Sequence, residues 1–62
     1  MNIPDDLIAL ERSAWEELQA GHLTAETASA VQAAVTAHSE EAGLDRYEVE
    51  MALKRIVRHP EG

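Results

Sequence analysis

The chain has 62 residues, with twelve acidic and five basic side chains, a formal net charge of −7 and no cysteine. This length allows one domain, spanning residues 1–62, and an apolar core in so short a chain rarely contributes more than about 3–5 kcal/mol of stability. Without cysteine, neither a disulfide nor a zinc–thiolate site can reinforce the core. Stability must therefore come from helix packing or from a second chain.

The composition predicts an all-α protein. Helix-forming residues dominate and sheet-forming residues are scarce, while a hydrophobic fraction of 45% is too high for a disordered chain. With no Phe, one Trp and one Tyr, the core must be aliphatic around Trp15. No apolar run approaches the roughly 18 residues that span a bilayer, and Asp5 and Asp6 stand where a signal peptide would be basic. We therefore expect a cytoplasmic protein that binds no membrane.

The first helix is expected over residues 4–20. Pro4 is preorganised for the first helical position, and Asp5 and Asp6 suit the positive helix end that follows. One broad face of this helix is apolar: Leu7, Ile8, Leu10, Ala14, Trp15 and Leu18. A stripe of that width predicts contact with two other helices.

The second helix is expected over residues 25–42. Gly21 ends the preceding helix, Leu23 is placed for a hydrophobic staple, and Thr24 is placed as the N-cap. One side gathers Ala28, Val31, Val35 and Ala42, and another carries Ala30, Ala33, Ala34 and Ala37. The line of small residues would permit close approach of a neighbouring helix.

The third helix is expected over residues 46–59. Gly43 ends the second helix, Asp45 and Glu48 have the spacing of a capping box, and Pro60 stops the third helix. Its apolar stripe comprises Val49, Ala52, Leu53, Ile56 and Val57. Three amphipathic helices with short connections predict a small antiparallel three-helix bundle.

Charge is unevenly distributed along the chain. Residues 1–45 hold nine acids and one base, for a net charge of −8, whereas residues 46–62 hold four bases and three acids, for a net charge of +1. Acids near helix starts and bases near the last helix end also suit the helix dipoles. The excess of acid disfavours general binding to nucleic acid.

The sequence predicts neither an enzyme nor a cofactor or metal site. The histidines lie in different segments without metal-ligand spacing, and the local pair His38 and Glu41 is ordinary on a helix surface. His38 is expected to be partly buried and hydrogen-bonded to a neighbour. There is no Cys nucleophile and no Gly-rich phosphate loop. A bundle of this size is also expected to lack the roughly 300 Å³ of concave volume that a small-molecule site needs.

Glu11 breaks the apolar pattern of the first helix, where an unpaired carboxylate would be costly. In one interpretation it reaches solvent or a base such as Arg46 or Arg55. In the other, part of the stripe around Trp15 is a docking surface, and Glu11 fixes the register of a partner chain.

A second candidate surface lies on the third helix. Tyr47, Met51, Lys54 and Arg58 recur at helical spacing opposite the apolar stripe. Tyr, Met and Arg are enriched at protein interfaces. These four residues are the first candidates for a protein-binding face, with Trp15 and Glu11 as the second choice, and the alternative is that Tyr47 and Met51 only pad the bundle edge.

The leading hypothesis is a small acidic interaction or regulatory module that binds another protein, or a second copy of itself as a homodimer, and takes no small-molecule substrate. One alternative is an acidic inhibitor that imitates DNA phosphates, of the type found in phages and mobile elements. Its carboxylates would be Asp5, Asp6, Glu16, Glu17, Glu26, Glu40, Glu41 and Asp45.

The other alternative is a DNA-binding regulator that uses the third helix. The stretch over residues 39–49 is similar to a helix-turn-helix motif at Gly43, Leu44 and Val49. It departs from the motif at Ser39, where a small Ala is expected, and at Asp45, where Ser or Thr would face a phosphate.

Overall fold

The computed structural model describes residues 2–58. These residues form three helices, α1 (Asp5–Gln19), α2 (Ala25–Ala42) and α3 (Arg46–Arg58), and no strand. The predicted all-α three-helix bundle is therefore confirmed, with helix ends within a residue of those expected. The expected end of the third helix at His59 and the stop at Pro60 lie outside the described residues.

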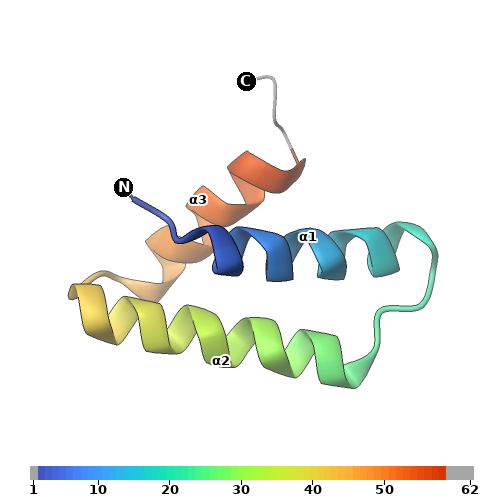
Figure 1. The fold of residues 1–62 in the computed structure, drawn as a ribbon, viewed down its shortest axis with the longest axis horizontal. Coiled ribbons are helices and arrows are strands. Elements are labelled where there is room, and N and C mark those ends of the chain that lie inside the picture. The colour runs from blue at the N-terminus through green and yellow to red at the C-terminus, as the bar shows by residue number, and fades with distance from the viewer. Residues whose placement is uncertain (1, 59–62) are drawn as a thin grey trace.

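The helices are arranged in two layers. In Figure 1, α1 and α2 run antiparallel side by side, and α3 crosses this pair obliquely after the turn that follows α2. The shortest dimension of the molecule is 18 Å, which is about twice the spacing between packed helices. Such a thin molecule leaves much of each helix exposed.

The two turns are formed as the glycine positions predict. Gly21 and Gly43 have φ values of 84° and 67°, in the left-handed region that glycine adopts at least cost. After α1, His22 N donates to Glu17 O and Gly21 N to Leu18 O, and after α2, Leu44 N donates to Ser39 O. Thr24 caps α2, because its Oγ1 accepts from Thr27 N at 3.1 Å.

Two expected caps differ in the structure. Pro4 is the N-cap of α1 and not its first helical residue, since its backbone is extended (φ −62°, ψ 146°) and leads back to the buried Ile3. The capping box at Asp45 is not formed among residues 2–58, because Asp45 Oδ1 accepts from Tyr47 N, at 3.4 Å, and Glu48 lies exposed. The Asp45 carbonyl still accepts the first helical hydrogen bond of α3, from Val49 N.

The core is aliphatic, as predicted. Its buried residues are Ile3, Leu7, Val35, Val49 and Leu53, and Ile8, Val31, Ala34, Leu44 and Ala52 pack against them. Every helix and the segment before α1 contribute, so the core lies where α3 crosses the α1–α2 pair.

The apolar stripes are only partly covered. Leu18 is 44% exposed and Ile56 37% exposed, although both belong to predicted stripes. Arg58, the last described residue of α3, contacts Glu11 and Trp15 of α1. The described part of α3 therefore ends before the turn of α1 that carries Leu18. Leu23, expected as a hydrophobic staple, is also exposed.

The alanine line of α2 does not form a close helix contact along its length. Ala34 packs against the core, whereas Ala30, Ala33 and Ala37 are exposed. Among residues 2–58, no helix has the length and apolar character needed to cross a membrane.

Candidate functional site

The most exposed aromatic side chain of the described chain lies on α3. Tyr47 is 67% exposed and Met51, one helical turn further on, is 40% exposed. With Glu48, Ala52 and Arg55 they line an open depression of about 380 Å³. We refer to these five residues as the α3 face. It combines an aromatic ring, a thioether and one charge of each sign.

The four residues selected from the sequence on the third helix do not form one strip. Tyr47 and Met51 belong to the α3 face, but Lys54 and Arg58 are half-buried and do not line its depression. The buried stripe of α3 consists of Val49, Leu53 and Val57. Around the helix, Lys54 lies closer to this stripe than Arg55 does, and Arg55 lies nearly opposite to it. Arg55 is therefore the exposed cation beside Met51, and sequence reasoning did not select it.

Arg58 is held by two side chains of α1. Its Nη2 lies 3.7 Å from Glu11 Oε2, and its Cζ lies 4.5 Å from the centroid of the Trp15 ring. The Glu11 side chain is 8% exposed and that of Arg58 30% exposed. The second-choice residues Glu11 and Trp15 thus form a cluster with Arg58 that joins α1 to α3.

The cluster corrects the expected partner of Glu11. Arg46 and Arg55 were the expected bases, yet Arg46 Nε lies 3.4 Å from Glu50 Oε2 and its Nη2 donates to Gln32 Oε1. Arg46 sits at the start of α3, and only the end of α3 reaches Glu11. Of Arg46, Arg55 and Arg58, only Arg58 forms an ion pair with Glu11.

A second concave surface lies between α1 and α2. It has a volume of about 450 Å³ and is open to solvent on one side. Its lining residues are Pro4, Asp6, Leu7, Leu10, Ala34, Ala37, His38 and Glu41. We refer to it as the α1–α2 groove. The expectation that a bundle of this size lacks such a concavity was wrong, because alanines on α2 leave unfilled the space that larger side chains would occupy.

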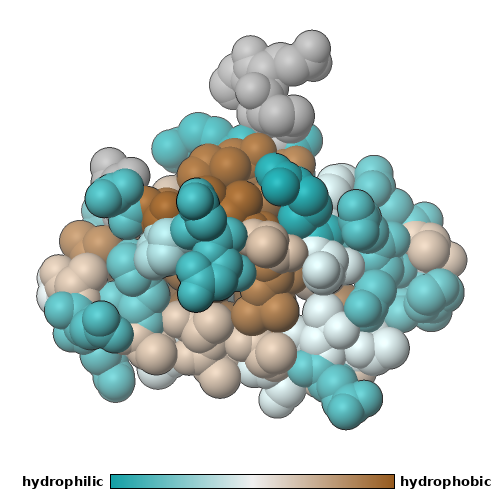
Figure 2. Space-filling view, viewed as in Figure 1, coloured by the Kyte–Doolittle hydropathy of each residue, from teal (hydrophilic) through white to brown (hydrophobic). Residues whose placement is uncertain are grey.

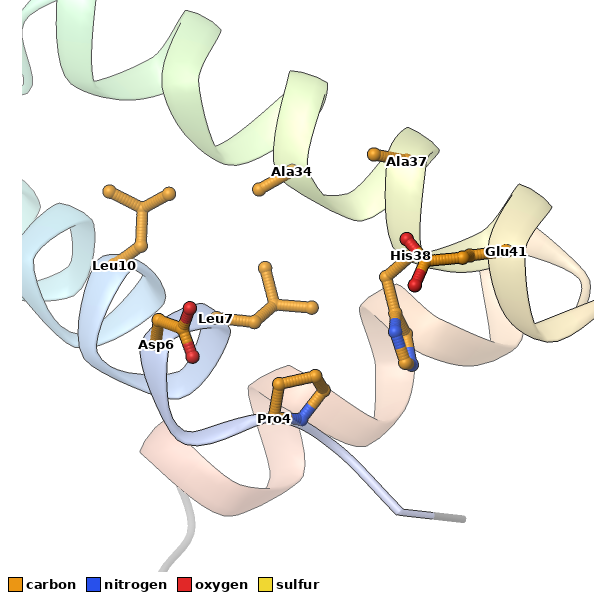
Figure 3. A pocket seen from close by; sticks show the side chains of 8 residues that line it. All are labelled: Pro4, Asp6, Leu7, Leu10, Ala34, Ala37, His38 and Glu41. Atoms are coloured by element: carbon orange, nitrogen blue, oxygen red, sulfur yellow. The ribbon is translucent and has the colours of Figure 1, made fainter.

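His38 stands in the wall of this groove (Figure 3). It is half-buried, as expected, but its Nε2 atom is buried without a hydrogen-bond partner. The expected hydrogen bond to a neighbour is therefore not made by this nitrogen. A buried imidazole nitrogen without a partner is costly.

Glu17 forms a hydrogen-bonded network at the turn between α1 and α2. Its Oε1 accepts from Thr24 N at 3.0 Å and from Thr24 Oγ1 at 3.2 Å, and its Oε2 accepts from Thr27 Oγ1 at 2.8 Å. The backbone hydrogen bond from Thr24, followed by the one from the Thr27 side chain, lowers the pKa of Glu17 below its ordinary value. The sequence placed Glu17 only among the carboxylates of the DNA-mimic alternative, and no signal predicted this network.

Figure 2 shows where apolar side chains reach the surface on one face of the molecule. Brown, hydrophobic side chains gather over the region where α3 meets α1, with teal, hydrophilic side chains beside and across them and paler side chains below.

No group of three or more His, Asp or Glu side chains within residues 2–58 is placed to hold a metal ion. The chain matches no protein-family model, no curated protein and no solved structure in the comparisons made.

Proposed function

We propose that this protein is a non-enzymatic interaction module that binds another protein through the α3 face. A cytoplasmic location is part of the proposal, since a domain without cysteine gains no stability from an oxidising compartment. The observation that carries the proposal is the exposure of Tyr47 and Met51 side by side on one helix.

The chemistry of the α3 face supports a binding role. Tyr and Met present large apolar area at a surface, and Arg can donate several hydrogen bonds at the same time. Glu48 and Arg55 flank the apolar pair with opposite charges, so they can set the orientation of a partner. These groups can supply burial and orientation for a complex.

Affinity capture from the native host tests the proposal. Immobilised wild-type protein is compared with Tyr47→Ser/Met51→Ser, and we expect the captured partner to be lost from the variant. The matched control is Leu18→Ser/Leu23→Ser, which removes two other exposed apolar side chains at the end of α1 and in the turn that follows it. Capture that survives the first double substitution, or that fails equally with the control, would contradict the proposal. Circular dichroism establishes that each variant is helical.

Arg58→Ala is not a suitable probe of this face. The side chain contacts Glu11 and Trp15, so its removal would change the packing of α3 on α1. Arg55→Ala removes the cation that lines the depression and leaves that cluster in place.

An acidic inhibitor that imitates DNA phosphates is a second candidate, and the exposure of its carboxylates favours it. Seven of the eight acids in question are exposed: Asp5, Asp6, Glu16, Glu26, Glu40, Glu41 and Asp45. Glu17 is the exception, because both of its oxygens accept hydrogen bonds within the chain. A basic nucleic-acid enzyme inhibited by the protein, with relief at high salt, would support this candidate over the first.

A further inference from the structure

The α1–α2 groove is a second surface, separate from the α3 face. None of its eight lining residues comes from α3, and none is shared with the depression on the α3 face. It therefore has its own chemistry, which the binding role of the α3 face does not explain.

The sides of the groove are apolar. Leu7 and Leu10 extend from α1 toward α2, where Ala34 and Ala37 face them with small side chains (Figure 3). Leu10 is only half-buried and Ala37 is exposed. A volume of about 450 Å³ next to these residues is enough to receive one or two aliphatic side chains from another molecule.

The charged residues that line the groove are both acidic. Asp6 lies on the α1 side and Glu41 on the α2 side, and no Lys or Arg is among the lining residues. Neither carboxylate takes part in an ion pair within residues 2–58. A cationic ligand can therefore contact either carboxylate without displacing an existing partner.

The shape of the groove favours a helix as the ligand. Its walls are two antiparallel helices, and the ridge of side chains on a third helix fits a furrow of this kind. Small residues on one wall let the backbone of that helix approach closely.

We propose that the α1–α2 groove binds an amphipathic helix of a partner protein, whose aliphatic side chain enters between α1 and α2 while flanking Lys or Arg residues pair with Asp6 and Glu41. Charge complementarity decides this choice of occupant, because both charged lining residues have the same sign. The protein then has two binding surfaces of different chemistry, one nearly neutral and one acidic.

A designed peptide provides the probe. It is an amphipathic helix of about four turns built from Leu and Lys, and its counterpart carries Glu in place of each Lys. Isothermal titration calorimetry at low salt measures binding to the full chain. We expect the Lys peptide to bind and the Glu peptide not to bind, and the reverse result or an absence of Lys-peptide binding would overturn the proposal.

Matched variants separate the groove from general charge attraction. Asp6→Asn/Glu41→Gln is expected to weaken Lys-peptide binding about tenfold, as two lost surface ion pairs would. Asp5→Asn/Glu40→Gln changes the net charge equally at exposed positions that do not line the groove, and we expect less than about a twofold change. If the two double variants lose the same amount of affinity for the Lys peptide, net charge alone attracts the peptide and the proposal is overturned.

A filled groove gives an independent test. Ala37→Leu places a larger side chain in the groove and should abolish binding, whereas Ala33→Leu, at an exposed position of α2 outside the groove, should leave it unchanged. Full binding by Ala37→Leu would overturn the proposal. Sedimentation equilibrium tests whether a second copy of the chain occupies the groove. If the wild type is a dimer and Ala37→Leu is a monomer, the groove binds a second copy, and the proposal of a different partner protein is overturned.

Discussion

The guanidinium of Arg58 lies over the ring of Trp15, with Cζ 4.5 Å from the ring centroid, and the same group reaches Glu11 Oε2 at 3.7 Å. One side chain at the end of α3 thus contacts two consecutive turns of α1. The ring supplies a cation–π contact and the carboxylate supplies the opposite charge. This arrangement explains how Glu11 is tolerated at 6% exposure in an apolar stripe.

Replacement of Arg58 should destabilise the fold. Arg58→Ala leaves Glu11 buried without its partner, which costs about 3–5 kcal/mol for a fully buried pair. Because the Arg58 side chain is 30% exposed, water can partly compensate, and we expect a loss of about 2 kcal/mol. Urea denaturation measures the free energy of unfolding. Arg55→Ala is the control, and an equal loss there would contradict a specific role for the cluster.

Replacement of Glu11 by an aliphatic residue should have the opposite effect. Glu11→Leu removes the buried charge, and Arg58 keeps its contact with Trp15 and its access to water. We expect a gain of about 1 kcal/mol in the free energy of unfolding, with an unchanged sedimentation coefficient. If the variant instead loses its captured partner or changes its oligomeric state, Glu11 has a role in docking, as the second interpretation of the sequence proposed.

The turn between α1 and α2 should be sensitive to acid. The pKa of Glu17 is lower in the folded chain than its ordinary value of 4.5, so its hydrogen bonds stabilise the fold above that value. This contribution is lost as the pH falls through the lowered folded-state pKa. The melting temperature of Glu17→Gln should therefore fall less steeply than that of the wild type on acidification. Glu16→Gln, at the neighbouring exposed position, should behave like the wild type.

Duplex DNA should not bind to the protein. The chain carries twelve acidic against five basic side chains, and two of the four cations of α3, Arg46 and Arg58, already have carboxylate partners. Fluorescence anisotropy with a labelled duplex at about 150 mM salt should show no change. Binding that weakens steeply with salt would instead support the helix-turn-helix alternative and contradict the DNA-mimic candidate.

Local sequence signals predict the fold of this chain well. Gly21 and Gly43 take the left-handed conformation and Thr24 caps α2, since these features depend on a few neighbouring residues. The aliphatic stripes of α1 and α3 likewise locate the core. Each of these signals has a range of one or two helical turns.

The partners of charged residues could not be predicted in the same way. Whether Glu11 meets Arg46, Arg55 or Arg58 depends on the direction in which α3 crosses α1, and nothing within either helix sets that direction. The same holds for the α1–α2 groove, whose lining residues come from positions 4–10 and 34–41. The sequence pairs His38 with Glu41 on one helix, but only the packed helices show that both line one groove with Asp6.

The buried side chains of the α1–α2 pair are all at one end. They are Leu7 and Glu11 on α1 and Val35 and Ser39 on α2, whereas no side chain from 12 to 34 is fully buried. Backbone amides near the α1–α2 turn should therefore exchange with solvent through local opening at low free energy, while those at the other end need global unfolding. The α1–α2 groove lies at the well-anchored end, so its partner would meet a surface that is already ordered and would lose little conformational entropy on docking.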